Sequence, residues 1–127
     1  MLRFILPIAY MIGIYLLSSI PGDATNPSSA SIILSLIPSS LQNLLHIPLF
    51  AGLFLSFQWA FSRKLITQRL TPKIIVFTCI IFAAFDEFHQ MAVPGRFASA
   101  SDFFLDTVGV ITGLFMAKHK SLSVWLR

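Results

Sequence analysis

The sequence predicts an all-α integral membrane protein, built as a bundle of four transmembrane helices. The first observation is composition. Of the 127 residues, 56% are hydrophobic and 11% are charged, whereas soluble domains have roughly 25% charged residues. The second observation is that long apolar runs recur four times, separated by polar segments, and a helix needs about 20 mostly apolar residues to cross a bilayer. Because the chain is short, we treat residues 1–127 as a single domain.

The predicted spans cover about residues 4–20, 44–61, 74–93 and 103–117. The first run contains no charged residue, and the second contains His46 and Gln58 among small polar groups. The third and fourth runs reach the required length only when their acidic ends are included. The first run has a second interpretation as a signal peptide. However, residues 18–22 lack a small-x-small cleavage pattern and three further apolar runs follow, so we expect an uncleaved span.

The basic residues predict the orientation of the spans. They are Arg3 before the first span, Arg63, Lys64, Arg69 and Lys73 between the second and third, and Lys118, Lys120 and Arg127 after the fourth. By contrast, residues 21–43 contain no Lys or Arg, and the segment after Val93 contains only Arg96. Because short cytoplasmic segments carry the excess of Lys and Arg, we expect both termini in the cytoplasm and two loops outside. This is the pattern of a multi-pass membrane protein.

The basic loop has a second interpretation as a nucleic-acid-binding segment. Its four basic residues lie between two apolar spans and have no aromatic stacking partners nearby, so membrane topology explains them better. We expect membrane lipids around the protein and no nucleic-acid partner. In the outer segment 21–43, Ile32, Ile33, Leu36 and Ile37 recur at helical spacing and predict a short amphipathic helix on the outer leaflet.

Four of the five acidic residues lie in one stretch, as Asp86, Glu87, Asp102 and Asp106. An unpaired carboxylate is costly in an apolar environment, and ionisable groups persist there mainly when they are paired or functional. The predicted topology brings this stretch to the outer end of the bundle. The residues expected to converge there are Asp86, Glu87, His89 and Gln90 of the third helix, Asp102 and Asp106 of the fourth, His46 of the second, and Arg96 of the loop.

Helical spacing predicts which way these side chains point. Asp102, Asp106, Gly109 and Gly113 form one stripe on the fourth helix. A Gly-x-x-x-Gly pair permits close helix contact in membranes, so the aspartates above it should face the bundle interior. On the third helix, Asp86 shares a face with His89 and Gln90. One of Asp86 and Glu87 is therefore expected to face a loop instead.

Simpler interpretations exist for several of these residues. Asp102 follows two serines and is a candidate helix cap, while Val93-Pro94-Gly95-Arg96 fits a type II turn. Arg96 has alternative roles in a salt bridge with an acid or in snorkelling to lipid phosphate. His46 stands two residues before Pro48, which predicts a kinked or early helix start. Asp106 is harder to explain in these ways because it lies one turn inside the span.

These residues also carry a resemblance to a known family. Asp86-Glu87-Phe88-His89-Gln90, Val93-Pro94-Gly95-Arg96, Ser101-Asp102, Asp106-Thr107-Val108-Gly109 and Gly113 resemble the signature of the VanZ-like family of small bacterial membrane proteins, and Asn43-Leu44-Leu45-His46 is similar to its earlier His motif. That family often has Lys or Asp ahead of the His and Tyr four residues after it, where this chain has Gln42, Asn43 and Phe50. It commonly has Asn or Asp at the position of Asp106. The resemblance implies a multi-pass protein of the bacterial cytoplasmic (inner) membrane, in a family whose named member is linked to resistance to the glycopeptide antibiotic teicoplanin.

Three functional hypotheses follow. The leading one is the binding or handling of a cell-envelope component, a lipid-linked or phosphorylated precursor. Arg96 and a protonated His89 would hold its anionic group, and the acids would orient it or exchange protons. The binding candidates are Arg96, Gln90, Asp102 and His46.

The second hypothesis is a metal-dependent hydrolase or transferase. Its catalytic candidates are Glu87, Asp86, His89 and Asp106, and its metal-ligand candidates are His89, Asp86 and Asp106. No spacing of the His-Glu-x-x-His kind is present, which weighs against a metal site. We therefore expect no cofactor, and a divalent metal only under this hypothesis. The third hypothesis is a structural subunit of a larger assembly, with protein partners that the sequence does not identify.

Overall fold

The computed structural model describes residues 2–22, 32, 36–61 and 71–118. Within them lie a short 3₁₀ helix η1 (Leu2–Phe4) and the helices α1 (Ile5–Ser18), α3 (Ser39–Leu44), α4 (His46–Phe61), α5 (Thr71–Gln90) and α6 (Ala100–Lys118). The described residues contain no strand, so the all-α prediction is confirmed. Residues 33–35 of the predicted amphipathic helix, and the basic residues Arg63, Lys64 and Arg69, lie outside the described residues.

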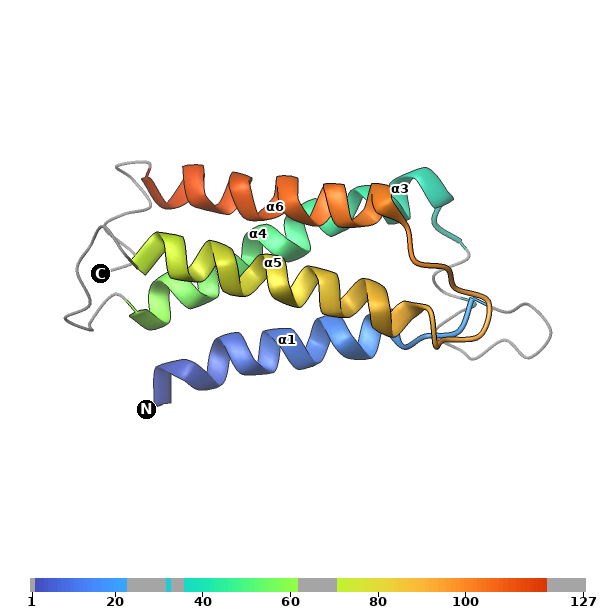
Figure 1. Cartoon of the computed structure of the whole chain (residues 1–127), viewed down its shortest axis with the longest axis horizontal. Coiled ribbons are helices and arrows are strands. Elements are labelled where there is room, and N and C mark those ends of the chain that lie inside the picture. The colour runs from blue at the N-terminus through green and yellow to red at the C-terminus, as the bar shows by residue number, and fades with distance from the viewer. Residues whose placement is uncertain (1, 23–31, 33–35, 62–70, 119–127) are drawn as a thin grey trace.

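The four long helices run side by side and alternate in direction along the chain (Figure 1). The first residues of α1 and α5 and the last residues of α4 and α6 lie at one end of the bundle. The end of α1, the helix α3 and the loop between α5 and α6 lie at the other end. Helix α4 packs against α1, α5 and α6 and is the central helix of the bundle.

A proline explains the break between α3 and α4. The helix stops at Leu44, turns at Leu45 and resumes at His46. Pro48 lacks the N–H that would bond to the carbonyl of Leu44, and its ring crowds that carbonyl. The break fits the interruption that the sequence predicts near Pro48. It places His46 in the first turn of α4.

Helices α5 and α6 both begin three residues earlier than the sequence predicts. Helix α5 covers 71–90 instead of 74–93, and α6 covers 100–118 instead of 103–117. The chain leaves α5 in a turn at Met91, and a second turn follows at 93–96. There the Arg96 N–H donates to the Val93 carbonyl at 3.1 Å, and Gly95 has φ 73°, as a type II turn requires.

The glycine stripe of α6 lies against α4. A Cβ atom added at Gly109 would lie 2.5 Å from the Ile47 carbonyl oxygen, and one added at Gly113 would lie 2.8 Å from the Ala51 carbonyl oxygen. The two backbones are therefore closer than any side-chain-bearing residue allows at these positions. This contact turns the face of α6 that carries Asp106 toward the bundle interior, where Asp106 is 0% exposed.

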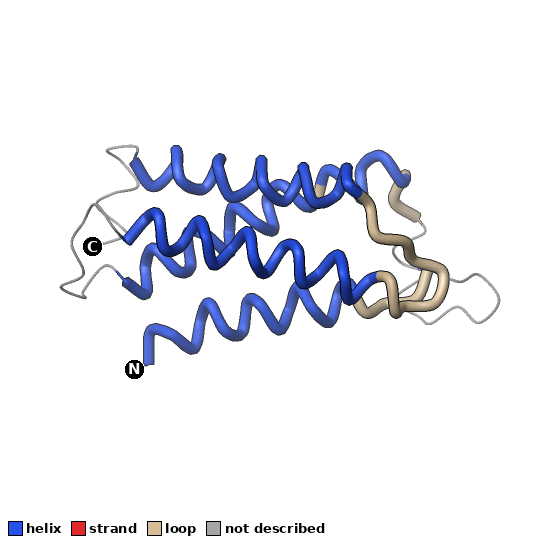
Figure 2. The backbone as a smooth tube through the Cα atoms, in the orientation of Figure 1, coloured by secondary structure: helices blue, strands red, loops and turns tan. Residues whose placement is uncertain are grey.

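The loop between α5 and α6 is attached to the end of α1 (Figure 2). The Gly22 N–H donates to the Pro94 carbonyl at 3.1 Å, and Arg96 Nε donates to the Ile20 carbonyl at 3.0 Å. A Cβ atom at Gly22 would collide with the Gly95 carbonyl oxygen. These contacts close one side of the bundle end.

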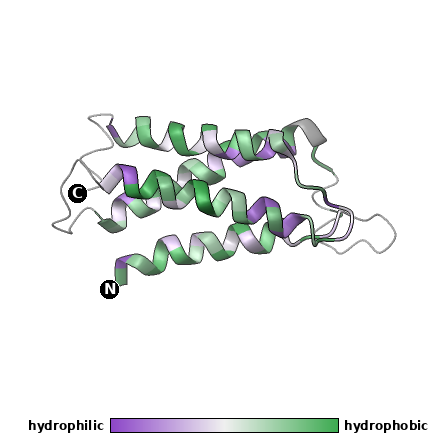
Figure 3. Cartoon of the chain, viewed as in Figure 1, coloured by the Kyte–Doolittle hydropathy of each residue, from purple (hydrophilic) through white to green (hydrophobic). Residues whose placement is uncertain are grey.

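Large apolar side chains are exposed and acidic side chains are buried, the reverse of a soluble protein. Phe77 and Phe115 are 67% and 65% exposed, whereas Asp86 is 1% exposed. Figure 3 shows largely hydrophobic helices, with hydrophilic residues gathered where α5 meets the following loop. Two helical segments are long and apolar enough to cross a membrane, Leu41–Phe61 and Ala100–Lys118, and Leu2–Ser18 is a shorter apolar helix. Exposed aromatic residues around buried acids indicate a protein whose outer surface contacts lipid.

Candidate functional site

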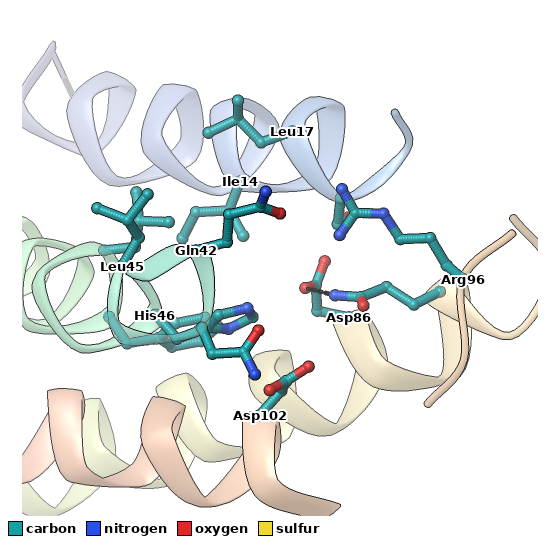
Figure 4. A pocket seen from close by; sticks show the side chains of 13 residues that line it. Ile14, Leu17, Gln42, Leu45, His46, Asp86, Arg96 and Asp102 are labelled. Carbon is teal, nitrogen blue, oxygen red and sulfur yellow. Dashed lines mark hydrogen bonds between the residues drawn. The ribbon is translucent and has the colours of Figure 1, made fainter. Parts of the chain in front are cut away.

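A cavity of about 140 Å³ lies at the end of the bundle where α1 finishes and α6 begins (Figure 4). A space of about 10–15 Å³ is enough to hold one enclosed water, so this cavity has room for several. Its polar lining residues are Ser18, Gln42, Asn43, His46, Asp86, Gln90, Arg96 and Asp102. Its apolar lining residues are Ile14, Leu17, Leu45, Leu49 and Phe50. Side chains from α1, α3, α4, α5, α6 and the loop after α5 therefore meet around one space.

His46 and Asp106 form an ion pair beside the cavity. His46 Nδ1 lies 2.7 Å from Asp106 Oδ1. The His46 side chain is 17% exposed and that of Asp106 is 0% exposed. An ionised carboxylate only accepts hydrogen bonds, so Nδ1–H donates to it, and the Nε2 atom of His46 remains for other contacts. The pair joins the first turn of α4 to α6.

Asp86 and Gln90 lie one helical turn apart on the face of α5 that lines the cavity. Gln90 Nε2 donates to Asp86 Oδ2 at 3.0 Å, and both residues are buried. This hydrogen bond fixes the orientation of the Asp86 carboxylate. The other oxygen of Asp86 has no hydrogen-bond partner among the described residues.

Glu87 bonds to the start of α6 instead of the cavity. The Ser99 N–H donates to Glu87 Oε2 at 2.7 Å, while Ser99 Oγ accepts a long hydrogen bond of 3.4 Å from the Asp102 N–H. In a capping box, the acid three residues after the cap would accept the N–H of the cap residue. Here the N–H of the cap residue, Ser99, is bonded to Glu87 and not to Asp102. The carboxylate of Asp102 therefore lines the cavity. The residue that caps α6 is therefore Ser99 and not Asp102, the candidate cap from the sequence. Of Asp86 and Glu87, the acid that faces a loop is Glu87.

Four acids each have one buried carboxylate oxygen without a hydrogen-bond partner in the described part of the chain. The atoms are Asp86 Oδ1, Glu87 Oε1, Asp102 Oδ1 and Asp106 Oδ2. A buried acceptor without a donor is costly, and the cost is larger for a charged group. Each of these oxygens therefore needs a donor, which a proton, a water molecule or a bound ligand can supply.

Arg96 lines the same cavity from the loop. Its Nε atom is occupied by the Ile20 carbonyl at 3.0 Å. Among the described residues, His46–Asp106 is the one ion pair within 4.0 Å, so the Arg96 guanidinium has no carboxylate at ion-pair distance there. The salt bridge considered from the sequence is therefore absent from the described residues. The terminal nitrogens of Arg96 remain as donors beside the cavity.

His89 does not line the cavity. Its Nε2 atom lies 2.8 Å from Ser19 Oγ, and its ring centre is 4.3 Å from that of Tyr15. The side chain thus packs on α1, although the spacing had predicted a face shared with Asp86. Within the residues that the structure describes, no group of three or more His, Cys, Asp or Glu side chains is arranged to hold a metal ion. The proposed set of His89, Asp86 and Asp106 is not gathered around one point.

Three polar cavity residues were not assigned a role from the sequence, Ser18 of α1 and two residues of α3. Gln42 and Asn43 lie on α3 and line the cavity, and Gln42 Nε2 donates to the Ile37 carbonyl at 2.7 Å. They stand ahead of His46, where the resemblance noted above had already indicated a polar position. The break at Leu45 turns α3 toward the cavity, and that geometry was not readable from spacing alone.

The fold and the site define a small all-helical membrane protein with a buried polar cavity at one end of its bundle. The sequence model of the VanZ/LLP1 family matches residues 4–124. The chain therefore belongs to the VanZ/LLP1 family, as the motifs in its sequence indicate. Neither a curated protein nor a solved structure matches the chain.

Proposed function

We propose that this VanZ/LLP1 protein crosses the inner membrane four times, with both termini in the cytoplasm and the cavity facing the outer leaflet. The alternation of the four long helices supports this arrangement. The described basic residues Arg3, Lys73 and Lys118 support the orientation, because they lie in η1, in the first turn of α5 and in the last turn of α6, at the end of the bundle opposite the cavity. Arg3 belongs to that end, where its guanidinium carbon lies 4.6 Å from the centre of the Trp59 ring. Trp side chains are enriched at membrane–water interfaces.

We further propose that the cavity binds or handles a lipid-linked or phosphorylated component of the cell envelope. The observation that carries this proposal is the Arg96 guanidinium, which lines the cavity without a carboxylate at ion-pair distance among the described residues. Its terminal N–H groups match two phosphate oxygens in a fork geometry. The apolar residues of the same cavity, including Leu17 and Leu45, suit the hydrocarbon part of a lipid. Binding an envelope precursor at the outer leaflet would affect susceptibility to glycopeptide antibiotics.

Cysteine labelling of intact cells tests the orientation. A single cysteine is placed at Thr67 or at Ala98 in a Cys79→Ser background. Ala98 is exposed in the loop after α5, whereas Gly95 of the same loop has a positive φ that other residues rarely adopt. A membrane-impermeant reagent is expected to label the cysteine at 98 and to spare the one at 67. Labelling only at 67 would reverse the topology and remove the envelope proposal.

Native mass spectrometry of the protein extracted with its own lipids tests the ligand. We expect a lipid-linked phosphate to accompany the wild-type protein and to be reduced in Arg96→Gln. The control Lys73→Gln removes one positive charge from an exposed residue in the first turn of α5. A protein free of lipid phosphate, or one whose bound lipid is unchanged by Arg96→Gln, would contradict the proposal.

One observation favours the second candidate, an enzyme. The His46–Asp106 pair has the geometry in which a carboxylate orients an imidazole for proton transfer. A hydrolase or transferase using this pair would turn over a lipid-phosphate substrate and lose activity in His46→Ala. Loss of turnover on addition of a chelator would indicate a metal-dependent enzyme. Turnover that is unchanged by a chelator would indicate acid–base chemistry by the pair.

A further inference from the structure

We infer that the ligand of this cavity carries an ammonium group close to its phosphate, as an amine-bearing phospholipid does. The inference rests on the proposed function and adds the charge pattern of the head group. It follows from the numbers and positions of the charged side chains around the cavity, and from the hydrogen-bonding capacity that they leave unused.

The cavity has more acids than cations. Asp86 and Asp102 line it, and Asp106 lies beside it in the pair with His46. That pair leaves Asp86 and Asp102 without a cationic partner among the described residues. A head group with only negative charge would bring its phosphate next to these two carboxylates, and like charges repel strongly in a medium of low dielectric constant. A neutral or positive group beside the carboxylates removes that conflict.

The unpaired oxygens require donors. Asp86 Oδ1 and Asp102 Oδ1 are both buried without a hydrogen-bond partner in the described part of the chain. Asp86 is 1% exposed, and its carboxylate is held toward the cavity by Gln90. A primary ammonium has three N–H donors, so it can satisfy carboxylates from two helices at once. Hydrogen bonds between charged partners are about twice as strong as those between neutral groups.

The phosphate position lies at Arg96. The Nε atom of Arg96 is bonded to the Ile20 carbonyl, which fixes the guanidinium at the end of α1 and leaves its terminal nitrogens available. Figure 4 shows Arg96, Asp86 and Asp102 around the same space, each reaching it from a different segment. A phosphate at Arg96 and an ammonium at the carboxylates are therefore neighbours within one cavity of about 140 Å³. A short linker, such as two carbon atoms, joins such groups in a phospholipid head group.

The same head-group chemistry occurs in a lipid and in a soluble phosphate ester. The lining favours the lipid, because Leu17 and Leu45 border the cavity and remain 46% and 41% exposed. In a membrane these side chains contact hydrocarbon, so an acyl chain leaving the cavity past them stays in an apolar environment. A soluble ester would leave this apolar border facing water.

Competition binding of the full-length protein in detergent tests the inference. Native mass spectrometry measures the ratio of bound phosphatidylethanolamine to bound phosphatidylglycerol from an equimolar mixture. The two lipids share the phosphate and differ in the ammonium. We expect a preference of about tenfold for phosphatidylethanolamine, the effect of one charged hydrogen bond. N-acetylation of the ethanolamine removes the positive charge and should abolish the preference. Because the ratio is measured within each sample, it does not depend on how much of a variant folds.

The variants separate the inference from the proposed function. Asp86→Asn and Asp102→Asn should lower the ratio about tenfold, because they weaken the binding of phosphatidylethanolamine and do not weaken that of phosphatidylglycerol, whose phosphate they no longer repel. Arg96→Gln should weaken the binding of both lipids. Glu87→Gln removes a carboxylate that bonds to the Ser99 N–H and does not line the cavity, and serves as the control, with a much smaller expected change in the ratio.

Equal binding of both lipids, lost in Arg96→Gln, would overturn the ammonium assignment and keep the proposed function. If both lipids bind Arg96→Gln as tightly as they bind the wild-type protein, the proposed function would be overturned as well. Displacement of the lipid by soluble phosphoethanolamine at an equal concentration would support the ammonium–phosphate chemistry and identify a soluble source. Failure of phosphoethanolamine to displace it would support the lipid source.

Discussion

His46 Nδ1 and Asp106 Oδ1 lie 2.7 Å apart and join the first turn of α4 to α6. Three residues below Asp106, the backbone of Gly109 lies against the carbonyl of Ile47, the residue after His46. The close helix contact and the ion pair therefore belong to one arrangement. Because Gly109 lets the helices approach, the carboxylate of Asp106 reaches the imidazole of His46, and the polar cavity forms directly above the apolar core.

The first prediction concerns this ion pair. His46→Ala leaves the fully buried Asp106 without a partner in the described residues, and breaking a buried pair by removing one member costs about 3 kcal/mol. Asp106→Asn keeps an oxygen for His46 Nδ1–H, and the imidazole, which is 17% exposed, can lose its extra proton, so we expect a loss of about 1 kcal/mol. Thermal unfolding of purified protein in detergent measures both. His89→Ala, which removes a histidine outside the cavity, should cost less than His46→Ala. A greater loss in Asp106→Asn than in His46→Ala would contradict the ionised pair.

The second prediction concerns the α4–α6 contact. Gly109→Ala and Gly113→Ala place a methyl group 2.5 Å and 2.8 Å from backbone oxygens of α4. Those oxygens can move only if the helices separate, so we expect each change to destabilise the fold by about 2 kcal/mol. Gly13→Ala is the matched control, because nothing lies within 4 Å of a Cβ atom there. It should be neutral or more stable by up to about 1 kcal/mol. Equal unfolding temperatures for all three variants would show that the close contact is not needed.

Helical spacing was sufficient to predict the interior stripe of α6. Asp102, Asp106, Gly109 and Gly113 share one face, and the fold places that face against α4 and the cavity. The type II turn at 93–96 was also predictable, because Pro and Gly in that order restrict the backbone to few conformations. Both features depend on local geometry, which the sequence encodes directly.

Tertiary contacts decided what spacing left open. By spacing, His89 and Gln90 both share a face with Asp86, yet only Gln90 bonds to it. His89 instead contacts Ser19 and Tyr15 of α1. The role of Glu87 as the acceptor for the Ser99 N–H required the position of the loop relative to α5. Neither contact has a counterpart in the local sequence pattern.

The third prediction concerns Glu87 and the start of α6. Glu87→Ala leaves the Ser99 N–H without its acceptor at 2.7 Å, and we expect a loss of about 1–2 kcal/mol of stability. Glu87→Gln keeps a carbonyl oxygen at the same place, so its loss should be smaller. In the Glu87→Ala background, Asp102 is three residues after Ser99 and can accept that N–H as in a capping box. Asp102→Asn should therefore cost more stability in that background than in the wild type, as a double-mutant cycle of unfolding free energies would measure. Additive effects would exclude this exchange of acceptors.

The last prediction separates the two contacts that Arg96 makes. Its Nε atom holds the end of α1 through the Ile20 carbonyl, and its terminal nitrogens remain for a ligand phosphate. Arg96→Lys loses the fork that binds two phosphate oxygens and the Nε donor, so both lipid binding and α1 attachment should weaken. Gly22→Val disturbs the same attachment through its collision with the Gly95 carbonyl and leaves the guanidinium in place. Native mass spectrometry of bound lipid, measured per folded protein, should fall about tenfold in Arg96→Lys. It should change less than about twofold in Gly22→Val, although that variant unfolds at a lower temperature. Equal losses of bound lipid in the two variants would mean that Arg96 acts by holding α1 and not by contacting the ligand.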